Sequence, residues 1–182
     1  NGWIGFGQDS DEWNNSSLPS SLAPSPAIFG FWDDLNPVND NCNQYCSGSV
    51  FYHSNDERIV VWFNEVAHWW TNFENSFYDF QIILYPNGEI NINYNSMIGN
   101  YEDGTVGIQN ANGNEGILMS YNDNYIQEEL SIFIKKEAEW LALSPVFGEL
   151  LYNNSEIHQI EISPLNLNNG EYSSYINIQS NI

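Results

Sequence analysis

The chain has 182 residues, of which 24 are Asp or Glu and 3 are Lys or Arg, so its formal net charge is −21. Nucleic acid and anionic membrane surfaces are excluded as partners, because phosphate recognition requires a basic surface. Aromatic residues make up 15% of the chain, which excludes a disordered acidic tail. No apolar run reaches the ~18 residues that cross a membrane as a helix. High salt or bound Ca²⁺ would relieve the charge repulsion, and both indicate an extracellular or cell-surface location.

Short apolar and aromatic runs separated by turn residues predict an all-β chain. The first two strands are expected at residues 3–6 and 29–32. A segment rich in Ser, Asn and Pro joins them from residue 8 to residue 28 and shows no periodicity. Loops of this length usually have a function or are held against the body of a domain.

Three predicted hairpins follow in chain order. In the second, a Pro86-Asn87-Gly88 turn precedes Ile90, Ile92 and Tyr94, which alternate with asparagines. This period of two indicates a strand with one buried and one wet face. Successive antiparallel pairs predict an antiparallel β-sandwich, with a barrel as the alternative. The predicted strand pairs are 50–53 with 58–63, 77–85 with 89–94, and 105–108 with 117–121.

A module boundary is predicted between residues 123 and 131, where the strand pattern stops and begins again. Apolar runs return at 131–134, 140–145 and 157–162. The sequence therefore predicts two modules, a sandwich over residues 1–123 and a second, incomplete one over 131–182. The second is short for an independent sandwich.

The first module contains three distinctive motifs, Asn1-Gly2-Trp3-Ile4-Gly5-Phe6-Gly7, Phe31-Trp32-Asp33-Asp34-Leu35 and Leu84-Tyr85-Pro86-Asn87-Gly88. With these motifs it resembles a nidogen-like extracellular domain of large secreted bacterial proteins over about residues 1–122. Members of this family are usually adhesive or accessory modules without catalytic activity. The resemblance therefore implies an extracellular β-sandwich that is not an enzyme.

The second module contains the motifs Trp140-Leu141-Ala142-Leu143-Ser144-Pro145, Ile160-Glu161-Ile162 and Gly170-Glu171-Tyr172. With these motifs it resembles the immunoglobulin-like repeats of the BACON type. Such repeats are spacers or binding modules. Both modules lack terminal strands that the families they resemble normally contain. We therefore expect either a segment of a longer secreted protein or sheets completed by strands from a neighbouring copy.

Cys42 and Cys46 lie close together in an Asn-rich segment. Outside the cell, this spacing predicts a small disulfide that closes a loop. A zinc site would need two further Cys or His ligands in a similar local pair. His53, His68 and His158 are isolated in the sequence, which argues against zinc.

Two acidic segments are candidate calcium sites, because hard cations take several oxygen ligands from polar loops. The alternatives are a solvated loop for the first and carboxylates that cap backbone N–H groups for the second. The candidate ligands are Asp9, Asp11 and Glu12 in the first segment, and Asp33, Asp34 and Asp40 in the second.

Aromatic side chains that could stack on sugar rings or form an interface gather in one region of the sequence. Core packing is the alternative role for them. Catalysis has no support, because no Gly-x-Ser-x-Gly motif occurs and no His is paired with a carboxylate in a recognisable motif. The candidate ligand or interface residues are Trp62, His68, Trp69, Trp70 and Phe73.

The sequence therefore predicts a non-catalytic extracellular structural or adhesive β-module. Its expected partners are neighbouring β-modules of the same or an identical chain, which would make it a subunit of a surface polymer or filament. The alternative is a carbohydrate-binding accessory module of a secreted hydrolase, with glycans as partners.

Overall fold

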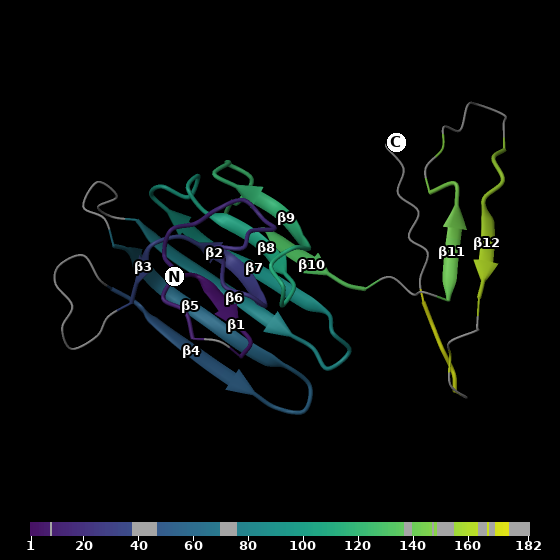
Figure 1. The fold of residues 1–182 in the computed structure, drawn as a ribbon, viewed down its shortest axis with the longest axis horizontal. Coiled ribbons are helices and arrows are strands. Elements are labelled where there is room, and N and C mark those ends of the chain that lie inside the picture. Colours follow the sequence, from purple (N-terminus) through teal and green to yellow (C-terminus); the bar gives the residue numbers. More distant parts are fainter. Residues whose placement is uncertain are drawn as a thin grey trace. The chain divides into compact units, whose positions relative to one another are not determined.

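The computed structural model describes residues 1–7, 9–37, 47–69, 76–136, 140–146, 148, 155–163, 167 and 170–174. These residues form twelve β-strands and no helix, so the all-β prediction is confirmed. With no helix among them, the described residues contain no helical span for a bilayer. The chain divides into two compact units, Asn1–Lys135 and Lys136–Ile182, which Figure 1 shows in sequence colours.

The first unit is an antiparallel sandwich of two sheets (Figure 1). Three antiparallel pairs confirm the predicted hairpins, namely Ser49–Ser54 with Ile59–His68, Phe77–Leu84 with Ile90–Ile98, and Thr105–Gln109 with Gly116–Tyr121. The four-stranded sheet has the order β1 (Trp3–Gly5), β2 (Ala27–Trp32), β8 (Thr105–Gln109) and β9 (Gly116–Tyr121). The six-stranded sheet has the order β10 (Ser131–Ile134), β7 (Ile90–Ile98), β6 (Phe77–Leu84), β5 (Ile59–His68) and β3 (Leu35–Asn36), with β4 (Ser49–Ser54) also paired to β5.

The main core lies between the two sheets. Phe31 of β2 packs against Tyr78 of β6, with ring centroids 4.6 Å apart. Gly30 lets the sheets approach closely, because a Cβ atom there would lie 2.6 Å from the Phe80 ring. The Tyr94 hydroxyl donates a 2.5 Å hydrogen bond to the Gly30 carbonyl. These contacts fix β2 against the centre of the six-stranded sheet.

The N-terminal loop, residues 9–26, covers the other face of the four-stranded sheet. Its Leu18 and Ala23 form a second buried cluster with Phe29 and Trp32 of β2. Polar contacts hold the same loop, because the indole N–H of Trp32 donates to a loop carbonyl at 3.2 Å. This explains why β2 is buried on both faces and shows no alternation. Of the two roles expected for a loop of this length, a function or attachment to the domain, the structure shows attachment.

The second unit contains one two-stranded sheet among its described residues, β11 (Leu141–Ser144) paired with β12 (Gln159–Ile162). The strand Ser131–Ile134 belongs to the first unit instead, as β10 beside β7. The predicted second module begins at residue 131, whereas the compact unit begins at Lys136. The physical reason is that Ile132 is buried in the core of the first sandwich.

Candidate functional site

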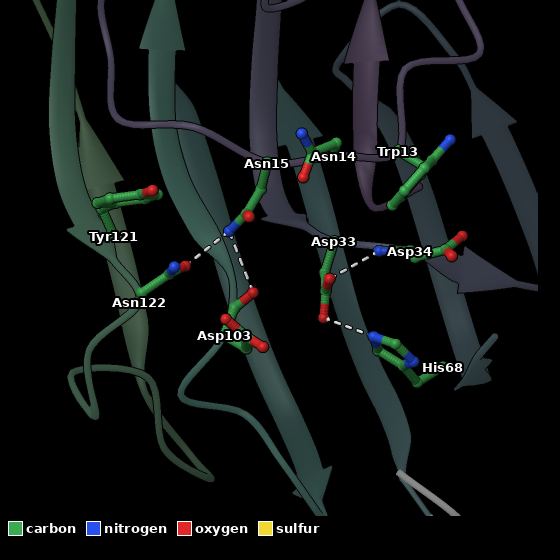
Figure 2. Close-up of a pocket in the computed structure, with 9 residues that line it drawn as sticks. All are labelled: Trp13, Asn14, Asn15, Asp33, Asp34, His68, Asp103, Tyr121 and Asn122. Carbon is green, nitrogen blue, oxygen red and sulfur yellow. Dashed lines mark hydrogen bonds and ion pairs between the residues drawn. The ribbon is translucent and has the colours of Figure 1, made fainter. Parts of the chain in front are cut away.

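Two hollows in the first unit bring together polar side chains from distant parts of the sequence. The first lies where the N-terminal loop meets the ends of several strands, and Figure 2 shows its lining. Its volume is about 410 Å³. The lining residues are Trp13, Asn14, Asn15, Asp33, Asp34, His68, Asp103, Tyr121 and Asn122.

Asp33 and His68 form the most buried polar pair of this hollow. Asp33 follows the last residue of β2, and His68 is the last residue of β5. The Asp33 Oδ2 atom lies 3.1 Å from His68 Nε2, and both side chains are largely buried. The other oxygen of Asp33 accepts the backbone N–H of Asp34 at 2.8 Å. Asp33 thus acts partly as a cap of backbone N–H groups, the alternative to calcium that the sequence left open.

Asp34 and Asp103 add two further carboxylates to the lining. Burial raises the pKa of the Asp34 carboxyl above its usual value, and the repulsion from Asp33 adds to this, whereas His68 acts in the opposite direction. On the opposite wall, the Asn15 amide donates to the Asp103 carbonyl at 3.1 Å and to the Asn122 side chain at 2.7 Å (Figure 2). Three of the nine lining residues are thus aspartates, and three more are asparagines.

The described residues do not assemble a metal-binding set. Among them, no group of three or more His, Cys, Asp and Glu side chains is placed to hold a metal ion. Asp9 and Asp11 are exposed, and Glu12 accepts the backbone N–H of Asn14 at 2.9 Å. The calcium sites therefore stay predictions.

Several predicted site residues lie outside the described part of the chain. They include one calcium ligand, the disulfide pair and two of the aromatic residues. These are Asp40, Cys42, Cys46, Trp70 and Phe73.

The structure separates the remaining aromatic candidates. His68 lies in the first hollow, whereas Trp69 is 44% exposed. Trp62 lies six residues earlier in β5, which corresponds to about 20 Å along an extended strand. Its neighbour Phe63 faces the core, so Trp62 faces away from it.

Trp62 lines the second hollow, which lies on the outer face of the six-stranded sheet. The volume of this hollow is about 300 Å³. Strands β5, β6 and β7 supply its walls, and their polar side chains alternate with core residues on the other face. The lining residues are Trp62, Asp79, Phe80, Gln81, Asn93, Tyr94 and Asn95.

Asp79 organises this second hollow. Its Oδ1 accepts the indole N–H of Trp62 at 2.7 Å, and its Oδ2 accepts the Asn95 amide at 3.3 Å. Asn95 is the extra residue of a β-bulge, because Phe80 pairs with Tyr94 whereas Asp79 pairs with the residue after Asn95. Bulges change the direction of a side chain and occur often beside functional sites.

No motif in the sequence marks Asp79, Gln81, Asn93 or Asn95 as site residues. The usable signal was the alternation of asparagine with apolar residues after residue 89, which predicts a wet face. What that alternation could not show is that Trp62 and Asp79 join the same face from two other strands.

Comparison with protein families gives a match over most of the chain. A family model described as NIDO related matches residues 1–147. This span covers the whole first unit and supports the nidogen-like resemblance, whereas nothing supports the BACON-type assignment, which stays a prediction. No curated protein and no solved structure matches the chain.

Proposed function

Because the chain belongs to the NIDO-related family, an extracellular type of β-module, we propose that it is a non-catalytic adhesive module that joins neighbouring β-modules by strand addition. The observation that carries this proposal is the edge strand β4. Its one partner among the described strands is β5, and every residue from Val50 to Ser54 is exposed. Unprotected edges of this kind pair readily with another strand.

The register of β4 defines which backbone groups point outward. The Asn55 N–H donates to the Arg58 carbonyl at 3.0 Å and closes the turn. Hydrogen-bonded and non-hydrogen-bonded pairs alternate along an antiparallel ladder, and the β4–β5 register has no shift. The N–H and C=O groups of Val50, Tyr52 and Ser54 therefore point away from β5.

The side chains of β4 also favour pairing. Its sequence, Ser-Val-Phe-Tyr-His-Ser, contains no Pro, Lys, Arg, Asp or Glu, and these residues are the usual devices that protect an edge. Tyr52 is 82% exposed. The occupant that fits is an extended strand from a second copy or from a neighbouring module of the same kind.

The net charge of the chain determines the salt concentration at which such an assembly can form. Two copies that each carry −21 repel one another, and salt shortens the range of this repulsion from about 10 Å at 0.1 M to about 3 Å at 1 M. We therefore expect sedimentation velocity to show monomers near 0.1 M NaCl and larger species near 1 M. Negative-stain microscopy would then show whether the larger species are filaments.

A pair of variants at one position tests the role of the edge. Tyr52→Pro removes an outward N–H without removing a bond to β5, so it should abolish the salt-induced assembly. Tyr52→Thr keeps that N–H and serves as the matched control. Monomers of the unmodified protein at both salt concentrations, or equal assembly of the two variants, would contradict strand addition.

Carbohydrate binding is the second candidate function, and the second hollow favours it. A tryptophan surrounded by amide and carboxylate side chains is a typical lining for a sugar site. The module would then be the accessory part of a secreted hydrolase. Retention of the protein by a polysaccharide is the basic test of this candidate.

A further inference from the structure

We propose that the hollow around Trp62 and Asp79 binds a neutral polysaccharide chain. Trp62 would stack on a sugar ring, and Asp79, Gln81, Asn93 and Asn95 would bond its hydroxyl groups. This inference rests on the second candidate function above, and it adds the site and the ligand class.

The indole of Trp62 is fixed before any ligand arrives. Asp79 holds its N–H at 2.7 Å, and the Phe51 ring packs beside it with centroids 5.6 Å apart and planes inclined by 41°. A side chain that is already ordered loses little conformational freedom on binding. The outer face of the sheet thus presents a rigid aromatic surface to solvent.

The polar groups around the indole have bonding capacity to spare. Gln81 forms no side-chain hydrogen bond within the described residues, and Asn93 accepts the Ser131 hydroxyl at 2.6 Å, which leaves its amide N–H groups as donors. Each oxygen of Asp79 accepts one hydrogen bond and can accept a second. Amides both donate and accept, as sugar hydroxyls do, so this set suits a polyol.

The lining selects against acidic sugars. It contains one carboxylate and no Lys or Arg, and the chain carries 24 acidic residues against 3 basic ones. Uronic, sialic and sulfated sugars would be repelled, whereas a neutral chain would not. Lack of charge in the ligand is therefore part of the proposal.

The register of the sheet provides space for several sugar rings. One row of opposed residues crosses five strands on the outer face, and strands about 4.8 Å apart give it a length of about 19 Å. Such a row can follow an extended chain better than it can enclose a monosaccharide. The row consists of Phe51, Trp62, Gln81, Asn93 and Ser131.

Affinity electrophoresis of the whole chain tests the site. Native gels would contain mixed-linkage β-glucan, xyloglucan or galactomannan as neutral probes, with alginate and hyaluronate as polyanions. We expect at least one neutral polysaccharide to retard the protein and neither polyanion to do so. Trp62→Ala, and separately the double variant Gln81→Ala with Asn93→Ala, should weaken the binding at least tenfold. Trp69→Ala, which removes an exposed tryptophan outside this hollow, should bind like the unmodified protein.

The outcomes separate this site from the wider function. If no neutral polysaccharide retards the protein, both the site and carbohydrate binding are wrong. If one does, but the Trp62 and Gln81–Asn93 variants bind normally or Trp69→Ala loses binding, carbohydrate binding stands and this site is wrong. Preference for a polyanion would also overturn the proposal. Thermal unfolding identifies a misfolded Trp62→Ala. In that case the double variant decides, because it truncates half-buried amides on the outer face of the sheet.

Discussion

Replacing Gln109 with alanine should loosen the N-terminal loop and destabilise the first unit. Gln109 is the last residue of β8, and its side chain is 5% exposed. Its Oε1 accepts the Ser20 N–H at 2.6 Å, while its Nε2 donates to the Ser25 hydroxyl at 2.7 Å and to the Ser20 carbonyl at 3.0 Å. One side chain thus fixes both sides of the turn that carries Ala23 into the second buried cluster.

The size of the effect follows from these three bonds. Each contributes about 1 kcal/mol net, so the free energy of unfolding should fall by about 3 kcal/mol. Loop backbone groups that become accessible to water in the variant would lower this figure, whereas groups left buried would raise it. A unit of this size loses roughly 3 °C of Tm per kcal/mol, so the midpoint should fall by about 9 °C.

Urea unfolding followed by tryptophan fluorescence measures this change. Gln81→Ala is the matched control, because it truncates the same residue type where the described residues offer no hydrogen bond, and it should change stability by less than about 0.5 kcal/mol. Gln109→Glu keeps the acceptor for Ser20 but loses the donors once it ionises, so its stability should fall as pH rises through the pKa of the new carboxyl. A loss below about 1 kcal/mol in Gln109→Ala, or a loss equal to the control, would refute this reasoning.

Three further predictions concern titration and metal. Burial raises the pKa of Asp34 above 3.8, so folding disfavours the ionised form of this carboxyl. Asp34→Asn should therefore raise Tm at pH 7, and this gain should disappear below pH 3.8, where Asp34 is protonated in both states. A gain in Tm that does not depend on pH would contradict burial as the cause. Burial also raises the pKa of Tyr94 well above 10, so stability should decline as pH rises past 10, where the unfolded tyrosine ionises first. Tyr94→Phe should flatten this decline in alkaline denaturation, with a remainder due to Tyr78, whose pKa is also raised by burial. Adding Ca²⁺ should raise Tm, and an unchanged midpoint in Ca²⁺ and in chelator would argue against both acidic sites.

The antiparallel hairpins could be predicted because their signals are local. The Asn87-Gly88 turn and the alternation after Glu89 are complete within one short segment, and the structure places both as expected in the β6–β7 pair. The β2 strand is a different case. All six of its residues are buried, so its sequence cannot show that one face meets the six-stranded sheet and the other meets the N-terminal loop.

The phase of alternation is lost where a bulge occurs. Ile92 and Tyr94 face the core, and a strict period of two would place Ser96 there as well. The structure instead buries Met97, because Asn95 is the extra residue in the pairing with β6. The same shift directs the Asn95 amide toward Asp79. The β-bulge that interrupts the alternation therefore also places Asn95 in the second hollow.

The candidate sites could be predicted only in part, because the sequence groups residues that are close along the chain. Asp33 and Asp34 were grouped with Asp40 as candidate calcium ligands. The structure places the first two in one hollow, where their neighbours include Asp103 and Asn122 from later turns. Trp62 and His68 were grouped because they are close in the sequence, and they lie in different hollows. Pairing between strands that are distant in sequence decides both outcomes.

Salt distinguishes the two proposed binding modes, because the charge of the chain enters them differently. Strand addition brings two strongly negative copies together, so screening should strengthen it. The hollow around Trp62 contains one carboxylate, Asp79, which is buried and already hydrogen-bonded to two neighbours, and its expected ligand is uncharged. Polysaccharide binding should therefore hardly change between about 0.1 M and 1 M NaCl, while assembly increases over the same range. The acidic composition would then act mainly by repelling polyanions and by opposing self-association at low salt. The amide-rich outer face of the sheet would bind the polysaccharide.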